Sequence, residues 1–235
     1  MNVDIWSDIA CPWCFIGKRR FEKALADFPH RDEVAVHWHS YQLDPTLPGH
    51  FDGTEVEYLS RRKGMPVEQV QQMIGYVSEQ ARGEGLQFDY DALVVANSLA
   101  AHQLLHLAKE QGVADRVKEA LLSAHFEGGH DIGNLGVLTD VGVAAGLDAD
   151  EIRSALETER FLPAVQGDIA EAREIGIQGV PFFVLGGRYG VSGAQPPSVF
   201  TRALEQAWQD GQPIRVVAGG ADEGGASCGP DGCAI

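Results

Sequence analysis

The chain has 235 residues, 44% of them hydrophobic, and a formal net charge of −16. This length can bury a full core and hold one large domain, or one domain with a sizeable insertion. The acidic excess argues against nucleic acid or an anionic membrane as a partner, because both require a basic surface.

The N-terminal sequence predicts a cytoplasmic protein. It has no basic n-region and no apolar h-region, and no stretch approaches the length of a membrane-spanning segment. Four cysteines form two close pairs, Cys11 with Cys14 and Cys228 with Cys233. In a reducing compartment such pairs are more often catalytic or metal-binding than structural.

The first segment predicts a β-α-β unit. Residues 3–6 form a short β-like run, and after Ala10 apolar residues recur at helical spacing to about Asp27. Pro12 falls in the first turn of that helix, where a missing N–H costs nothing. Residues 34–38 alternate between apolar and other side chains, which is typical of a strand.

The middle of the chain predicts an all-helical block. Helix signals dominate here, and Asp148 with Glu151 three residues later forms a capping-box pattern. The expected helices cover residues 66–83, 91–110, 114–126, 135–145 and 150–159.

The pattern then returns to a mixture of helices and strands. The expected elements are a helix at 164–175, a strand at 180–185, a hairpin turn at Gly186-Gly187, a strand at 189–191 and a helix from Pro196 or Pro197 to about 209. We assign residues 1–54 and 164–211 to one discontinuous α/β domain. Residues 55–163 form its helical insertion, and residues 212–235 a glycine-rich, irregular tail with the second cysteine pair.

Cys11-Pro12-Trp13-Cys14 lies where the first strand meets the first helix. A helix N-terminus favours a thiolate, because its unpaired N–H groups and macrodipole are positive there. We expect Cys11 to be exposed, with a lowered pKa, and to attack a substrate disulfide. Cys14, one turn into the helix, is expected to be more sheltered and to close the internal disulfide. The alternatives are half of a zinc site or two incidental thiols.

Three local sequences carry a family resemblance. They are Asp8-Ile9-Ala10-Cys11-Pro12-Trp13-Cys14-Phe15-Ile16-Gly17, Gly176-Ile177-Gln178-Gly179-Val180-Pro181-Phe182-Phe183 and Ser192-Gly193-Ala194-Gln195. With the split element order, they resemble the DsbA family, and its FrnE-like branch in particular, from about residue 2 to about residue 208. The resemblance implies an α/β thioredoxin-like fold interrupted by an all-helical insertion domain.

The resemblance also implies site roles. Cys11 is the nucleophile and Cys14 the resolving thiol. Pro181 is a cis proline facing them, although trans is the default for an isolated X–Pro bond. The Val180 backbone would then pair with an extended substrate as a short added strand. Pro12 and Trp13 complete the expected substrate contacts.

The implied activity is that of a cytosolic thiol-disulfide oxidoreductase or isomerase acting on protein disulfides. Its partners would be disulfide-containing or misfolded polypeptides and a thiol reductant such as glutathione or a thioredoxin-type system. The reaction requires no dissociable cofactor, and we assign no metal site.

The second pair lies in Cys228-Gly229-Pro230-Asp231-Gly232-Cys233, where a turn-forming centre can close a small disulfide ring. We interpret it as an auxiliary redox pair that exchanges electrons with Cys11 and Cys14. A soft-metal site and a passive tail are the alternatives.

Two rival functions stay open. Kappa-class glutathione transferases and 2-hydroxychromene-2-carboxylate isomerases share this fold, but they typically carry serine where Cys11 stands. A metal-binding holdase is the other rival. A zinc-protease motif at His102 and His106 is rejected, because Gln103 replaces the glutamate that must act as general base.

Overall fold

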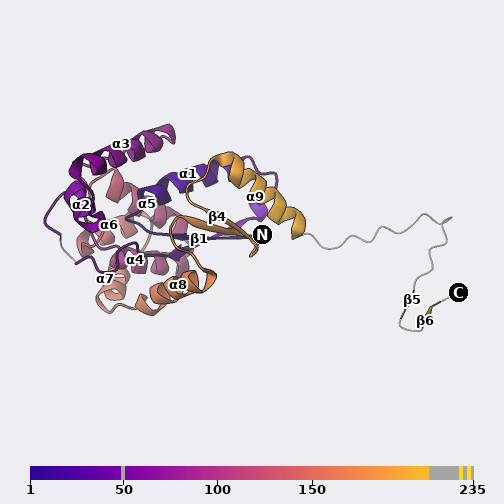
Figure 1. The fold of residues 1–235 in the computed structure, drawn as a ribbon. Coiled ribbons are helices and arrows are strands. Elements are labelled where there is room, and N and C mark those ends of the chain that lie inside the picture. The colour runs from indigo at the N-terminus through magenta and orange to yellow at the C-terminus, as the bar shows by residue number, and fades with distance from the viewer. Residues whose placement is uncertain (49–50, 212–227, 230–231, 234–235) are drawn as a thin grey trace.

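A four-stranded sheet forms the centre of the molecule in the computed structural model (Figure 1), which describes residues 1–48, 51–211, 228–229 and 232–233. The strands are β1 (Asn2–Ser7), β2 (Ala35–Ser40), β3 (Phe182–Leu185) and β4 (Tyr189–Ser192). Their order is β2-β1-β3-β4, with β1 parallel to β2 and antiparallel to β3, and β3 antiparallel to β4. The predicted strands and the α/β class are confirmed.

Helices cover both faces of this sheet. On one face α1 (Pro12–Ala26) and α9 (Pro197–Asp210) pack against each other, and α8 (Leu162–Ile175) lies against β2 on the other (Figure 1). Phe21 of α1 contacts Phe183 of β3 and Phe200 of α9, with ring centroids 5.5 and 5.7 Å apart. These contacts hold the first helix, and with it the cysteine pair, against the sheet.

The segment between β2 and α8 supplies six further helices: α2 (Glu55–Lys63), α3 (Val67–Gly83), α4 (Leu99–Glu110), α5 (Ala114–Phe126), α6 (Leu135–Ala144) and α7 (Ala149–Glu157). A 3₁₀ turn at Arg31–Glu33 precedes β2. Helix α4 is central, because it packs on α5, α6, α7 and α8 and buries every side chain from Ala101 to Ala108. The largest apolar cluster runs without a break from Ile5 of the sheet to Leu104 of α4. The division into domains at residues 54 and 163 stays a prediction.

The helix expected at 91–110 begins eight residues later, at Leu99, so that prediction is wrong for its first two turns. Side chains before α4 satisfy the backbone in a non-helical form. Asp89 Oδ1 accepts the N–H groups of the second and third residues after it, each at 3.1 Å. Asn97 Oδ1 accepts the N–H of Leu99 at 2.9 Å. Such local hydrogen bonds compete with helix formation, and the helical periodicity of the sequence does not include them.

The N-cap part of the capping-box prediction for α7 is confirmed, since Asp148 accepts the N–H groups of Asp150 and Glu151. The Glu151 carboxylate does not complete the box, because it accepts from Arg160 Nη2 at 3.2 Å. The irregular tail predicted after residue 211 lies outside the described residues, except for β5 (Cys228–Gly229) and β6 (Gly232–Cys233), which pair antiparallel. Among the described helices, none has both the length and the apolar character needed to cross a bilayer.

Candidate active site

Cys11 is the N-cap residue of α1, with an extended backbone at φ −105° and ψ 111°. Pro12 begins the helix, so no N–H is lost there. The N–H of Cys14 donates to the carbonyl of Cys11 at 3.0 Å, and both thiols are free. The two cysteines therefore occupy the first turn of α1, as the sequence predicts.

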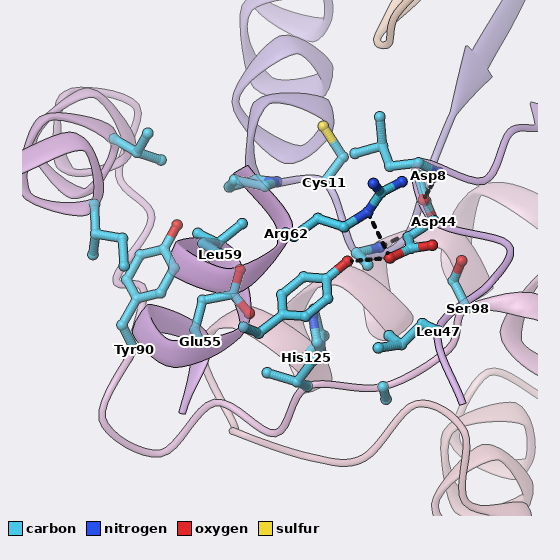
Figure 2. A pocket seen from close by; sticks show the side chains of 18 of the residues that line it. Asp8, Cys11, Asp44, Leu47, Glu55, Leu59, Arg62, Tyr90, Ser98 and His125 are labelled. Carbon is cyan, nitrogen blue, oxygen red and sulfur yellow. Dashed lines mark hydrogen bonds and ion pairs between the residues drawn. The ribbon is translucent and has the colours of Figure 1, made fainter. Parts of the chain in front are cut away.

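The expected exposure of Cys11 is wrong. The residue is only 3% exposed and Cys14 is 2% exposed. Helices α2 and α3 of the inserted segment line a partly open cavity of about 400 Å³ together with Cys11, Pro12 and Trp13 at the start of α1. Figure 2 shows Cys11 beside the α2 residues of this cavity. Cys11 therefore lines a partly open cavity, and an exposure predicted from sequence could not include walls supplied by distant residues.

The predicted proline lies directly against this site. The Val180–Pro181 peptide bond is cis, and Cys11 Sγ donates to the Val180 carbonyl at 3.7 Å. A Cβ added to Gly17 would come within 2.8 Å of Pro181 Cγ. Gly17 thus lets α1 approach the cis proline closely, which explains a glycine inside a helix. All six residues predicted around the first cysteine pair gather here.

Helix α2 supplies much of the cavity wall. Glu55, Tyr58, Leu59 and Arg62 all line the cavity, together with Tyr90 from the irregular segment before α4 (Figure 2). Burial raises the pKa of Glu55 to about 7. A carboxyl group with that pKa exchanges protons near neutral pH, so it can act as an acid or a base toward a sulfur compound in the cavity.

The Asp44 carboxylate, in the loop after β2, binds the part of the cavity wall that α2 forms. Asp44 Oδ2 accepts hydrogen bonds from Tyr58 Oη and Arg62 Nε, each at 2.9 Å (Figure 2). These bonds hold α2 across the cavity from Cys11, so the shape of the cavity depends on contacts between the sheet side and the inserted helices.

A second polar group lies around Cys14. Asp8 accepts the N–H of Leu43 at 2.7 Å and lies 3.2 Å from His102 Nε2. Burial raises the pKa of Asp8, but hydrogen bonds from His102 and Leu43 outweigh it and lower that pKa. Burial lowers the pKa of His102 and raises that of Cys14 well above its ordinary value. Lys118 of α5 is fully buried in the same region, and burial lowers its pKa to about 8.

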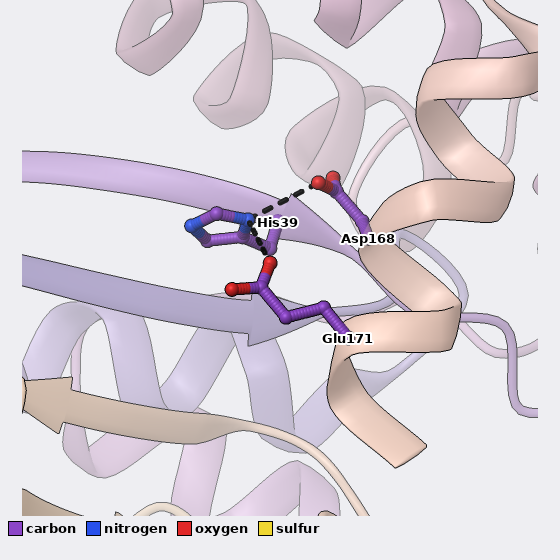
Figure 3. Close-up of side chains that lie close together, drawn as sticks. All are labelled: His39, Asp168 and Glu171. Carbon is purple, nitrogen blue, oxygen red and sulfur yellow. Dashed lines mark hydrogen bonds and ion pairs between the residues drawn. The ribbon is translucent and has the colours of Figure 1, made fainter. Parts of the chain in front are cut away.

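One cluster could offer metal ligands. The side chains of His39, Asp168 and Glu171 approach one another (Figure 3), with His39 Nδ1 3.1 Å from Asp168 Oδ1 and 3.9 Å from Glu171 Oε2. However, Lys109 Nζ lies 3.3 Å from Asp168 Oδ2, and the Ser40 N–H donates to the same oxygen at 2.7 Å. The Lys109 ammonium and the Ser40 amide already bind the Asp168 carboxylate. These hydrogen-bond donors favour an ion-pair cluster over a metal site.

The second cysteine pair is only partly described. Cys228 and Cys233 are backbone partners in the β5–β6 ladder. Their side chains lie outside the described part of the structure, so the auxiliary redox prediction stays a prediction.

Sequence reasoning missed the groups that the inserted helices bring to the cysteines. Glu55, Tyr58 and Lys118 look like ordinary surface residues of amphipathic helices, and no local pattern separates them from neighbouring charged positions. Asp8 is part of the first motif, and its proximity to Cys11 in sequence could have identified it. For His102 the sequence suggested only a polar or packing role in its helix once the zinc-protease motif was rejected, whereas it faces Asp8.

The chain is similar to known proteins in both sequence and structure. The family model "DSBA-like thioredoxin domain" matches residues 2–205. The chain is similar to the crystal structure of a probable DsbA oxidoreductase, SCO1869, from Streptomyces coelicolor, with 42% identity and a TM-score of 0.86 over 100% of this chain and 99% of that one. It is 26% identical to the uncharacterized protein YwbO of Bacillus subtilis over 208 residues, which are 87% of this chain and 96% of the relative.

A more distant relative is similar to this chain in its fold alone. The cytosolic disulfide reductase DsbM from Pseudomonas aeruginosa, whose structure was solved with GSH, shares 18% identity and a TM-score of 0.64 over 89% of this chain and 100% of that one.

Proposed function

The chain belongs to the DsbA-like thioredoxin domain family, and on that premise we propose that it is a cytoplasmic thiol-disulfide oxidoreductase or isomerase acting on protein disulfides. The observation that carries this proposal is the position of Cys11. It caps α1, lies 3.7 Å from the carbonyl of Val180 beside a cis proline, and opens into a cavity. These features supply a nucleophilic thiol, a backbone segment that a substrate can pair with, and a space for a reacting sulfur compound.

The proposed cycle begins with the Cys11 thiolate. It attacks a substrate disulfide, and the mixed disulfide is held against the backbone of Val180 and Pro181 as a short added strand. Pro12 and Trp13 contact the substrate from the first turn of α1. Cys14 then displaces the substrate, or a second substrate thiol does so, and the latter outcome is isomerisation.

The burial of Cys11 limits which disulfides can react. A folded protein surface cannot reach a thiol that is 3% exposed beneath α2 and α3, whereas an extended polypeptide segment or a small disulfide can enter a cavity of about 400 Å³. We therefore propose misfolded or extended polypeptides as substrates and a small thiol such as glutathione, or a thioredoxin-type system, as reductant. The GSH in the DsbM structure is consistent with the small-thiol partner.

The tail pair has a proposed supporting role. Cys228 and Cys233 would relay electrons to or from Cys11 and Cys14, since two thiols on either side of a turn-forming Pro-Asp-Gly can close a small disulfide ring. The general family pattern does not require such a tail. No cofactor takes part in this cycle.

Reactivation of a scrambled-disulfide protein in a glutathione buffer tests the proposal. Wild type, Cys11→Ser and Cys228→Ser/Cys233→Ser are compared side by side. We expect wild type to restore activity above the buffer rate and Cys11→Ser to lose the effect, because the attacking thiolate is gone. The rate of the tail variant measures the contribution of the second pair.

Recovery that is indifferent to Cys11, or no recovery above buffer, contradicts the proposal. Saturable conjugation of glutathione to a small electrophile that survives Cys14→Ser would then identify the kappa-class type of transferase. Metal content that falls in Cys228→Ser/Cys233→Ser, with holdase activity retained in Cys11→Ser/Cys14→Ser, would identify the metal-binding alternative.

A further inference from the structure

Lys118 is a buried cation without a carboxylate partner. Its side chain is fully buried in α5, and within the described ranges its Nζ has no hydrogen-bond partner. Nζ lies over the ring of Trp38, 5.4 Å from the ring centre. Burying an ammonium without a counter-ion is costly, so the environment of this residue requires an explanation.

A neighbouring lysine shows the contrast. Lys18 of α1 is 2% exposed in its side chain, but it pairs with Glu22, with Glu119 at 2.9 Å and with Asp115 at 3.8 Å. The chain therefore surrounds one buried lysine with three carboxylates and leaves the other without any at ion-pair distance in the part of the fold that is described. Lys118 is left free to respond to a charge that appears only during a reaction.

Most of the groups close enough to act electrostatically on Lys118 belong to the candidate active site. Cys14, Asp8 and Cys11 favour its charged form, whereas Lys18 opposes it. His102 of α4 also interacts with it. Asp8 already accepts hydrogen bonds from His102 and from backbone N–H groups, which stabilise its charge. Burial raises the pKa of the Cys14 thiol, and the Lys118 charge opposes that shift, so Cys14 is the acidic group that gains most from Lys118.

We propose that the Lys118 ammonium is the counter-charge of the Cys14 thiolate during resolution of the mixed disulfide. The inference rests on the proposed exchange at Cys11 and Cys14 and assigns a positioning residue to its second step. Because Lys118 belongs to the inserted helices, resolution by the thioredoxin-like part depends on a charge delivered by the insertion.

The resolving step is an exchange between one thiol and one disulfide. The Cys14 thiol loses its proton to water, and its thiolate forms a bond to Cys11 Sγ while the bond from Cys11 Sγ to the substrate sulfur breaks. That sulfur leaves with the electron pair and takes a proton from water. Over the whole cycle the two cysteines are oxidised by two electrons and the substrate disulfide is reduced. Lys118 exchanges no electrons and lowers the energy of the buried thiolate, which burial otherwise destabilises.

The test uses the full chain with Cys228→Ser/Cys233→Ser, so that only the first pair reacts. Reduced protein is mixed with dithiobis(nitrobenzoate), which releases one coloured thiolate when Cys11 attacks and a second when Cys14 resolves. Lys118→Met removes the charge, Lys118→Arg retains it, and Lys109→Met is the matched control, because Lys109 pairs with Asp168 instead.

We expect Lys118→Met to slow the second release by about tenfold and to move the midpoint of its pH profile upward by about one unit, since one unit is tenfold in thiolate fraction. The first release should change less, and Lys118→Arg and Lys109→Met should stay close to wild type. The groups facing Lys118 that could also titrate are Asp8, Cys11, Cys14, Lys18 and His102, and all are unchanged in these variants. The thermal midpoint of Lys118→Met should equal or exceed that of wild type, because an unpaired buried charge has been removed.

A second release at the wild-type rate and pH profile overturns the inference, as does equal slowing by Lys118→Arg and Lys118→Met. If Lys118→Met does not fold, Lys118→Gln is measured in the same way, and failure of both to fold assigns the lysine a structural role instead. Absence of the first release in the wild-type background contradicts the proposed function itself, so the two failures are distinguishable.

Discussion

Glu55 is the first residue of α2, and its carboxyl group lines the cavity into which Cys11 opens. Burial raises its pKa from 4.5 to about 7. The folded protein therefore retains a proton that the unfolded chain releases between these two values. Because the folded state binds more protons in that window, Glu55 makes the free energy of unfolding fall as pH rises from about 4.5 to 7.

Replacing Glu55 with Gln should remove this dependence. Above about pH 8 we expect Glu55→Gln to be more stable than wild type by about 2 kcal/mol, and near pH 4 to be equal, since a shift of this size is worth a few kcal/mol before solvent screening. Urea unfolding at both pH values measures the difference. Glu68→Gln on the exposed side of α3 is the control, and an equal gain there would contradict the argument.

Helix α2 is the least buried of the elements around the site, since none of its residues is fully buried. Its stability depends on its ends. Thr54 Oγ1 accepts the N–H of Glu57, while Glu57 Oε2 accepts the N–H of Thr54 at 2.9 Å, and these bonds form a capping box. The helix ends at Gly64, whose φ of 63° suits glycine. The wall of the cavity is therefore held by local hydrogen bonds and by Asp44.

Removing the cap should loosen this wall without unfolding the protein. Thr54→Ala should cost about 1 kcal/mol of local stability, which makes amide hydrogen exchange in α2 about five times faster while the global melting temperature changes little. The KM for a small disulfide should rise, because α2 lines its site. Asp148→Ala, which removes the cap of α7, is the matched control and should leave exchange in α2 unchanged. Identical exchange in α2 of Thr54→Ala and wild type would refute this assignment.

At the scale of the whole molecule, Asp168 of α8 links the sheet to the inserted helices. It accepts from the Ser40 N–H, and it lies 3.1 Å from both His39 Nδ1 and His106 Nε2 and 3.3 Å from Lys109 Nζ. Burial raises the pKa of Asp168, but the hydrogen bonds from His106 and His39 outweigh it and hold that pKa far below its ordinary value. Burial lowers the pKa of His39, and Asp168 more than reverses this shift.

Asp168→Asn should therefore destabilise the protein by about 2 kcal/mol near pH 6, because it leaves the half-buried Lys109 and His39 without their partner. The contribution of Asp168 is present above its ordinary pKa of 3.8 and is lost as pH falls through its folded pKa. That of His39 is present below 6.5 and is lost as pH rises through its raised folded pKa. Denaturant unfolding across pH should thus show the largest difference from wild type between these limits. Asp140→Asn on the exposed side of α6 controls for charge, and a difference independent of pH would contradict the ion-pair account.

The sequence by itself determined most of the elements and the family, although α2 was not among the expected helices and α4 begins later than expected. The strands at 3–6 and 34–38, the cap at Asp148 and the order of elements around the insertion are local patterns of spacing and hydrogen bonding, so they can be predicted from neighbouring residues. The DsbA-like family was predicted from three motifs and is confirmed. Cys11, Cys14 and Pro181 were found in the same way, because each lies in a motif that can be recognised without its surroundings.

Only the tertiary structure decided what surrounds the thiols. Cys11 is buried because α2 and α3 return over it from residues more than forty positions away, and Glu55 and Lys118 become part of the site through that same folding. Burial and the distance between charges set the pKa of a side chain, and both depend on contacts between segments far apart in the chain. Sequence patterns therefore identify the candidate reactive residues, whereas the fold sets their exposure, their charge partners and the size of the cavity beside them.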